Sequence, residues 1–285
     1  MRVAVTGATG LIGTRLSAAL RARDDDVTAI SLRQGAPPPG ALAGHDAVVH
    51  LAGEPVAQRW TKAARERIRS SREEGTRALV EAIASSEPRP AVLVSASAVG
   101  YYGARGDEPL EEDAAPGDDF LAQVCVAWER EAGAAANLSP PALRVVTVRT
   151  GVVLDRSGGA LAKMLPPFRL GIGGPVAGGR QYLPWIHVDD LVGIYLAALD
   201  DEAWSGPVNA SAPEPVTNAA FSKALGRALH RPAFAPVPAL AIRALYGDMA
   251  EIVTEGQRAM PRLALELGYA FAHPDLDEAL ADALR

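Results

Sequence analysis

The sequence predicts an α/β protein with a parallel sheet flanked by helices, followed by a smaller, mostly helical C-terminal subdomain. Two observations lead to this fold class. Short apolar runs alternate with helical patterns through the first half of the chain, an order typical of βαβ units. After about residue 151 the alternation weakens, and prolines interrupt a mostly helical tail. We expect a nucleotide-binding domain over residues 1–210, with substrate-side loops from about 151, and a helical subdomain over 211–285.

The expected elements follow in chain order. Apolar runs bounded by turn residues predict strands over 3–6, 27–32, 47–51, 91–95 and 143–150. Helical periodicity predicts helices over 11–23, 61–86 with a break near Gly75, and 118–136, capped by Asp118 or Asp119. Segments 35–44, 104–117 and 169–185 have loop composition. The stretch "DDLVGIYLAAL" predicts a further short helix, with Asp189 as its N-cap.

Composition limits the classes of partner. The net charge of −6 provides no basic field for nucleic acid or an anionic membrane. No apolar stretch is long enough to span a bilayer. Cys125 is the only cysteine, so no intramolecular disulfide can form. We expect a cytoplasmic protein with a small-molecule substrate and with neither nucleic acid nor membrane as a partner.

Three glycines, at positions 7, 10 and 13 of "MRVAVTGATGLIGTRL", lie between the first strand and the first helix. In a strand–loop–helix turn such glycines permit the tight turn, the approach of a pyrophosphate and close helix packing. The spacing G-x-x-G-x-x-G is a variant of the dinucleotide fingerprint. The alternative is a glycine-rich turn without a ligand. We therefore predict cofactor contacts from Gly7, Thr9, Gly10, Leu11, Ile12 and Gly13.

The ends of the second and third strands indicate which cofactor is bound and how its ribose could be held. The second strand ends in "ISLRQG", with Ser31 and Arg33 and no following acid. An acid there favours NAD and an arginine accommodates a 2′-phosphate, so we favour NADP, with NAD as the weaker alternative. The weaker alternative is that Arg33 is a solvated loop residue. The third strand ends in "HLAGEP", where Leu51, Ala52 and Gly53 would let a ribose approach the backbone.

These motifs carry a family resemblance. In this order, "TGATGLIG", "DAVVHLAG", "SASAVGYYG" and "WIHVDDL" resemble the extended short-chain dehydrogenase/reductase superfamily, which includes nucleotide-sugar epimerases and dehydratases. With "GGRQYLPWIHVDDL", "EGQRAMP" and the C-terminal region, the whole chain resembles its atypical epimerase-like family, which carries a C-terminal domain of unknown function. The resemblance implies a Rossmann-like fold and NADP(H) binding by Ser31 with Leu32 or Arg33, by Leu51 and Ala52, and by Arg72 of "RSSR". Arg72 could also be a solvated helix residue.

The catalytic pair of that superfamily is missing. Its chemistry uses Tyr-x-x-x-Lys with a nearby serine, the lysine lowering the tyrosine pKa for proton transfer. Ser97 suits the serine role, but the matching stretch "FLAQVCVAWE" places Leu121 and Cys125 at the tyrosine and lysine positions. Tyr101 or Tyr102 could reach the nicotinamide side instead, or could simply pack the loop. We predict Ser97, Tyr101 and Tyr102 as catalytic candidates.

Other polar residues lie near the expected cleft. The loop "GGRQYLPW" offers Arg180, Gln181 and Trp185 for a diphosphate or sugar-like substrate, or it is only structural. Arg149 ends a strand and either points to the sheet edge or pairs with an acid. Histidines 45, 50, 187, 230 and 273 show no metal-ligand spacing, so we predict no metal.

The sequence thus favours an NADP(H)-dependent oxidoreductase or epimerase with non-standard acid/base groups. A dinucleotide-binding sensor or interaction protein without turnover is the alternative, which the missing pair supports. A phosphate-loop NTPase is excluded because no Lys-Ser/Thr follows the glycines.

Overall fold

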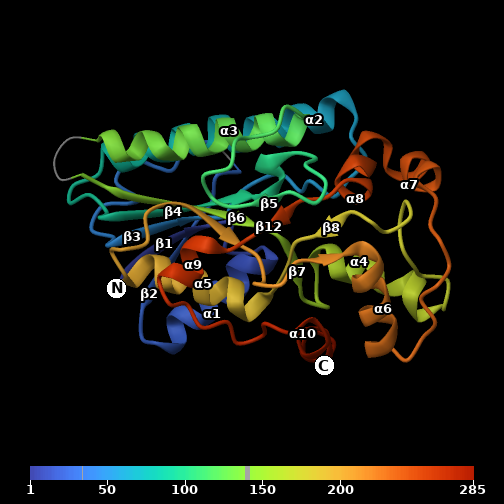
Figure 1. Cartoon of the computed structure of the whole chain (residues 1–285). Coiled ribbons are helices and arrows are strands. Elements are labelled where there is room, and N and C mark those ends of the chain that lie inside the picture. Colours follow the sequence, from blue (N-terminus) through green and yellow to red (C-terminus); the bar gives the residue numbers. More distant parts are fainter. Residues whose placement is uncertain (34, 139–141) are drawn as a thin grey trace.

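The computed structural model describes residues 1–33, 35–138 and 142–285 and is built on a six-stranded sheet. The strand order is β10-β6-β4-β3-β1-β2, and every neighbouring pair is parallel (Figure 1). The strands are β1 (Arg2–Thr6), β2 (Asp26–Ile30), β3 (Ala47–His50), β4 (Val92–Ala98), β6 (Arg144–Thr150) and β10 (Gly206–Ala210). The predicted α/β fold is confirmed, with each expected strand in place to within a few residues.

Helices cover both faces of the sheet, which explains why its central strands are apolar on both sides. Helices α2 (Lys62–Ala84) and α3 (Phe120–Gly133) lie on one face, and α1 (Leu11–Ala22) and α5 (Val188–Asp200) lie on the other (Figure 1). Along β1, Val3 and Val5 pack in the core beside α1 and α5, while Ala4 packs in the core beneath α2.

Two helix predictions need correction. Helix α2 continues through Gly75 without a break, because Thr61 caps it through Ala64 N and packing holds its apolar face. Helix α5 begins at Val188, and its N-cap is His187, whose ring accepts the Asp189 amide. Asp189 is therefore inside the first turn. Asp119 caps α3, one of the two predicted positions.

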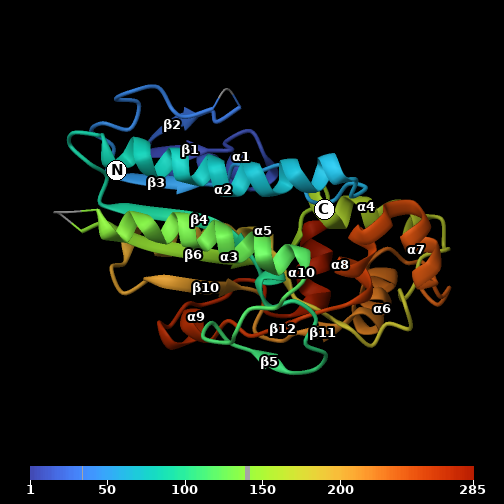
Figure 2. The same ribbon diagram turned by 90° about the horizontal axis from the view of Figure 1, so that it is seen from above.

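A second core forms at one end of the sheet. Apolar side chains of β7 (Val152–Leu154), β9 (Trp185–His187) and α4 (Gly159–Arg169) pack there against α6 (Asn218–Ala228) and α10 (Leu276–Ala283). Figure 2 shows α6, α7 (Ala239–Tyr246), α8 (Glu251–Thr254) and α10 gathered there. The predicted helical C-terminal region is confirmed.

Short elements connect the two cores. The acidic loop over 104–117 contains β5 (Pro109–Leu110), which pairs with β12 (Arg258–Ala259). Strand β8 (Tyr182–Leu183) pairs with β11 (Val216–Thr217). The remaining elements are α9 (Arg262–Glu266) and the 3-10 turns η1 (Val99–Tyr102), η2 (Ala134–Asn137) and η3 (Gly247–Ala250). Tyr269 and Phe271 pack on the sheet core, so the boundary near residue 210 stays a prediction.

Within the part of the chain that the structure describes, no helix combines the length and the apolar character needed to cross a membrane.

Candidate functional site

The strand order reverses at β1, since β2 pairs on one side of it and β3 on the other. Ligands of open α/β sheets bind in the crevice at such a switch point, outside the carboxyl ends of the strands. Gly7 follows β1 there with φ +69°, and a Cβ on it would lie 2.7 Å from the Leu51 carbonyl carbon. The loops after β1 and β3 therefore meet in backbone contact, which only glycine permits.

The amino end of α1 opens into this crevice. Its N-cap is Gly10, no side chain of the described residues caps it, and its first turn holds no acid. A Cβ on Gly10 would meet only Gly7 O, at 3.3 Å, whereas one on Gly13 would lie 2.2 Å from the same oxygen. Gly13 thus serves packing, and Gly10 leaves room above an uncapped helix end. Such an end attracts an anion.

The turn after β3 rests on a buried polar network. The amides of Leu51 and Ala52 donate to Thr6 Oγ1 at 3.1 and 3.3 Å. The ring of His50 joins Thr6 Oγ1 at 2.7 Å and Thr76 Oγ1 at 2.9 Å. Complete burial, aided by the Arg72 cation, lowers the pKa of His50 to about 4, so the ring is neutral at pH 7.

Arg72 lies beneath the same turn. Its Nη1 donates to Glu54 O at 3.0 Å and to Ile68 O at 3.2 Å, and its Cζ lies 4.8 Å from the Trp128 ring centroid. A Cβ on Gly53 would lie 3.1 Å from that Cζ. Arg72 is therefore held against the predicted cofactor turn instead of projecting into solvent as a free helix residue.

Ser31 and Arg33 lie just after β2, the edge strand beside β1. Both residues are exposed, and the Arg33 amide lies 3.4 Å from Ser31 Oγ. The structure thus leaves the Arg33 guanidinium accessible at the carboxyl edge of the sheet. Its contact with a 2′-phosphate stays a prediction.

Helix α3 brings the positions of the missing pair to the end of β4. A Cβ on Gly100 would lie 3.5 Å from Leu121 Cβ, so the leucine lies against the loop that follows Ser97. Cys125 is buried, and this burial raises the pKa of its thiol to about 12. A neutral thiol cannot supply the positive charge that a lysine brings to this position.

A different charged group lies at the end of β4 instead. Ser97 Oγ donates to Glu129 Oε1 at 2.6 Å, and Glu129 forms a two-pronged ion pair with Arg149, with both contacts at 2.8 Å. Arg149 is buried; burial disfavours its cation, but bonding to Glu129 prevails and raises its pKa. The ion-pair alternative for Arg149 is the one the structure shows. Glu129, the last residue of "FLAQVCVAWE", was not predicted from the sequence as a partner of Ser97.

The two tyrosines differ sharply. Tyr102 is fully buried, accepts from Arg149 Nη1 at 2.9 Å and donates to Asn209 Oδ1 at 2.7 Å. Burial raises the pKa of Tyr102 to about 12. Tyr101 is half-buried, and Arg149 Cζ lies 3.5 Å from its ring centroid. Of the pair, only Tyr101 keeps an accessible side chain.

The three side chains of the loop that were predicted to bind substrate do not face one common position. Arg180 is exposed. Gln181 Nε2 donates to the carbonyls of Val176 and Val253, at 3.0 and 2.9 Å. Trp185 is 1% exposed in the second core, because β9 pairs with β7 and turns the indole inward. The structure therefore leaves Arg180 available to a ligand and withholds the Trp185 ring from stacking.

The switch-point sheet, the open end of α1 and the glycine contacts define a Rossmann-like protein. The profile of the NAD dependent epimerase/dehydratase family matches residues 3–210, and that of a domain of unknown function (DUF1731) matches 237–283. The chain belongs to this epimerase/dehydratase family.

The similarity to known proteins covers the whole chain. The Bos taurus "Epimerase family protein SDR39U1" is 42% identical over 297 residues, covering 100% of both chains. A crystal structure of "human epimerase family protein SDR39U1 (isoform2) with NADPH" has a TM-score of 0.91 at 39% identity and covers 99% of each chain. The "nucleoside-diphosphate sugar epimerase from Corynebacterium glutamicum" has a TM-score of 0.80 at 35% identity, covering 100% of this chain and 58% of that one.

Proposed function

We propose that the chain is an NADP(H)-dependent oxidoreductase or epimerase that acts on a small carbonyl compound or a nucleotide sugar. The observation that most directly supports dinucleotide binding is the uncapped amino end of α1 at the switch point, where Gly10 leaves space above the helix. A human relative crystallised with NADPH supports the same cofactor. When bound, the nicotinamide supplies or accepts the hydride.

Ser97 is the residue that would hold the reacting oxygen. Its proton is donated to Glu129, so its lone pairs are left to accept from the hydroxyl of an alcohol substrate. A carbonyl substrate would be held if that proton turned from Glu129 to the carbonyl oxygen. Glu129 and Arg149 act as positioning residues, because they orient the serine without facing the substrate. Tyr101 would carry the substrate proton, with its ring held against the Arg149 guanidinium.

The cofactor assignment is tested by Gly10→Ala. The added methyl meets only Gly7 O, so the fold should survive while the space for the pyrophosphate is reduced. We expect NADPH affinity to fall by about tenfold or more, as for loss of a charge-assisted contact. The matched control is Gly75→Ala, where nothing lies within 4 Å of the added atom. Equal NADPH affinity in both variants, measured by fluorescence titration, would contradict the assignment.

The preference for NADP is tested by Arg33→Ala. Removing the guanidinium should weaken NADPH binding by about tenfold through loss of a charged hydrogen bond and leave NADH binding unchanged. Arg21→Ala removes an exposed arginine at the opposite end of α1 and is the control. A parallel loss for both coenzymes would remove the basis of the preference.

Turnover separates this proposal from its rival, a non-catalytic NADP(H)-binding sensor. The rival is favoured by the uncharged Leu121 and Cys125 at the usual catalytic positions. Oxidation of NADPH is followed with a panel of carbonyl compounds. Conversion of nucleotide sugars is followed by NMR in the presence of NADP+, because epimerisation consumes no coenzyme overall. We expect Ser97→Ala and Tyr101→Phe to lower kcat by about 100-fold, as loss of a general acid/base does, with NADPH affinity unchanged. Tight NADPH binding without turnover of any compound would favour the sensor.

The predicted cytoplasmic location also stays a prediction, which cell fractionation tests.

A further inference from the structure

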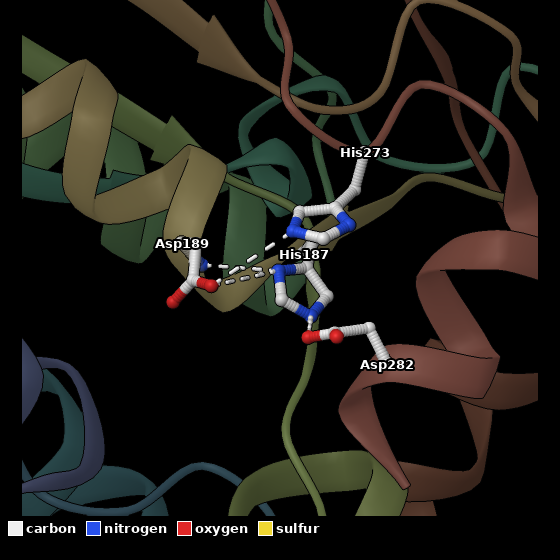
Figure 3. A group of neighbouring side chains, drawn as sticks. All are labelled: His187, Asp189, His273 and Asp282. Atoms are coloured by element: carbon white, nitrogen blue, oxygen red, sulfur yellow. Dashed lines mark hydrogen bonds and ion pairs between the residues drawn. The ribbon is translucent and has the colours of Figure 1, made fainter. Parts of the chain in front are cut away.

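Four side chains that could hold a metal ion gather at the amino end of α5 (Figure 3), and none of them is a candidate cofactor or catalytic residue described above. His187 ends β9, Asp189 lies in the first turn of α5, His273 follows α9, and Asp282 belongs to α10. One nitrogen or oxygen atom of each lies within 4.8 Å of the others. Three distant segments thus supply two imidazoles and two carboxylates to one place.

The separations are too long for hydrogen bonds. Asp189 Oδ2 lies 3.8 Å from His187 Nδ1 and 3.8 Å from His273 Nε2, while Asp282 Oδ2 lies 3.5 Å from His187 Nε2. Good hydrogen bonds to nitrogen span about 2.7–3.2 Å. Two ligands on a tetrahedral zinc ion, each about 2.0–2.1 Å from the metal, lie about 3.4 Å apart. These three spacings are longer than hydrogen bonds and close to ligand–ligand distances. The other pairs, which lie up to 4.8 Å apart, would close around the ion when it binds.

His187 provides an independent indication of a ligand. Its side chain is 2% exposed, and its Nε2 has no hydrogen-bond partner among the described residues. A buried polar atom left unpaired costs free energy. This Nε2 points toward the Asp282 carboxylate, as Figure 3 shows. A cation bound at Nε2 would satisfy this atom. The ring proton would then lie on Nδ1, which would donate toward Asp189 Oδ2, 3.8 Å away, instead of accepting the Asp189 amide.

Hydrogen bonds to Asp190, which is not itself in the cluster, also hold the cluster in place. The buried Asp190 carboxylate accepts the amides of Ala272 at 2.6 Å and His273 at 3.0 Å, and Tyr269 Oη donates to Asp190 O at 3.0 Å. These bonds fix the segment that carries His273, whose ring centroid lies 3.8 Å from that of His187. Such outer contacts orient the ligands of metal sites. The Asp189 side chain is 60% exposed, which gives an ion a path from solvent.

We propose that His187, Asp189, His273 and Asp282 bind one zinc-type divalent ion that ties the C-terminal segment to α5. Nitrogen and carboxylate oxygen together suit Zn²⁺, whereas Mg²⁺ and Ca²⁺ prefer oxygen alone. Four protein ligands leave no open position, so the ion is structural. The spacing of the histidines along the sequence predicted no metal. It gave no sign of this cluster, because only the fold brings these four residues together.

The test uses the full chain after removal of metals with a chelator. Calorimetric titration with Zn²⁺ should show one ion per chain, Co²⁺ should produce the visible absorption of a tetrahedral site, and Zn²⁺ should raise the Tm until EDTA is added. His273→Ala and Asp282→Asn should each weaken Zn²⁺ binding at least about tenfold. His230→Ala and Asp277→Asn alter exposed residues of the same region and should leave it unchanged.

His187→Ala also removes the cap of α5, so His273→Ala is the deciding variant. Absence of stoichiometric Zn²⁺ binding by the wild type, or equal binding by His273→Ala and His230→Ala, would overturn the proposal. NADPH affinity, measured in the same variants, should stay unchanged. The metal site and the proposed cofactor site can therefore fail independently.

Discussion

Arg149 joins several buried groups of the candidate site. It is 3% exposed and contacts Glu129, Tyr102 and Tyr101. A buried arginine cannot lose its proton, so its carboxylate partner must remain. The arrangement therefore couples the stability of this region to the placement of Ser97, which bonds the same carboxylate.

Glu129→Gln tests this coupling at the level of stability. Removing one partner of a buried ion pair leaves an uncompensated charge, which costs about 3 kcal/mol. We expect the urea midpoint to fall accordingly. Glu131→Gln, on the same helix, breaks pairs with two largely exposed arginines and should cost less than about 1 kcal/mol. Similar midpoints for both variants would show that Arg149 is solvated.

His50 predicts a pH dependence. Its pKa is lowered to about 4 in the folded chain, by burial first, so the unfolded chain binds the extra proton between about pH 6.5 and pH 4. Stability is therefore highest above pH 6.5 and falls as the pH drops toward 4, by about 3 kcal/mol from this group. NMR titration of the His50 ring should find a midpoint near 4, and a midpoint near 6.5 would contradict the burial argument.

At the scale of elements, α2 shows how a cap and packing outweigh a glycine. Thr61 closes its first turn and Gly75 lies in its middle with open space around it. Thr61→Ala should destabilise the protein by about 1 kcal/mol through loss of the cap. Gly75→Ala should stabilise it by about 0.5–1 kcal/mol, since alanine is the better helix former. Thermal unfolding measures both, and shifts in the same direction would contradict the prediction.

The start of α5 shows that tertiary packing can outweigh the preference of a residue type for the N-cap position. Asp189 has the residue type and position of an N-cap, yet the His187 ring accepts its amide instead. Burial of His187 fixes the ring at this point. Asp189 is thereby free to face His273.

At the scale of the whole molecule, the C-terminal segment closes back onto the sheet. Asp190 anchors it through Ala272 and His273, and Tyr269 and Phe271 pack on the core beside α5. Asp190→Ala should cost about 3 kcal/mol through loss of two hydrogen bonds to a buried carboxylate. Limited proteolysis should then cut the segment after α9 faster. Asp277→Ala, at an exposed ion pair, is the control, and equal cleavage would contradict the anchoring role.

The sheet and the glycine turn were predictable from sequence because their signals are local. An apolar run, a turn residue and a helical period act over a few neighbours, and Gly7, Gly10 and Gly13 have no side chain that context could redirect. The side chains of the candidate site were less predictable. Tyr101 and Tyr102 are adjacent and alike in sequence, yet one is half-buried and the other fully enclosed.

By itself, the sequence determined the alternating elements, the open helix end and the lack of the Tyr-x-x-x-Lys pair. Only the tertiary structure decided that Glu129 holds both Ser97 and Arg149, that Trp185 is buried, and that His187 meets His273. The physical reason is distance along the chain. Burial and pairing depend on which remote segments the folded core brings together, and no local pattern of residues encodes that choice.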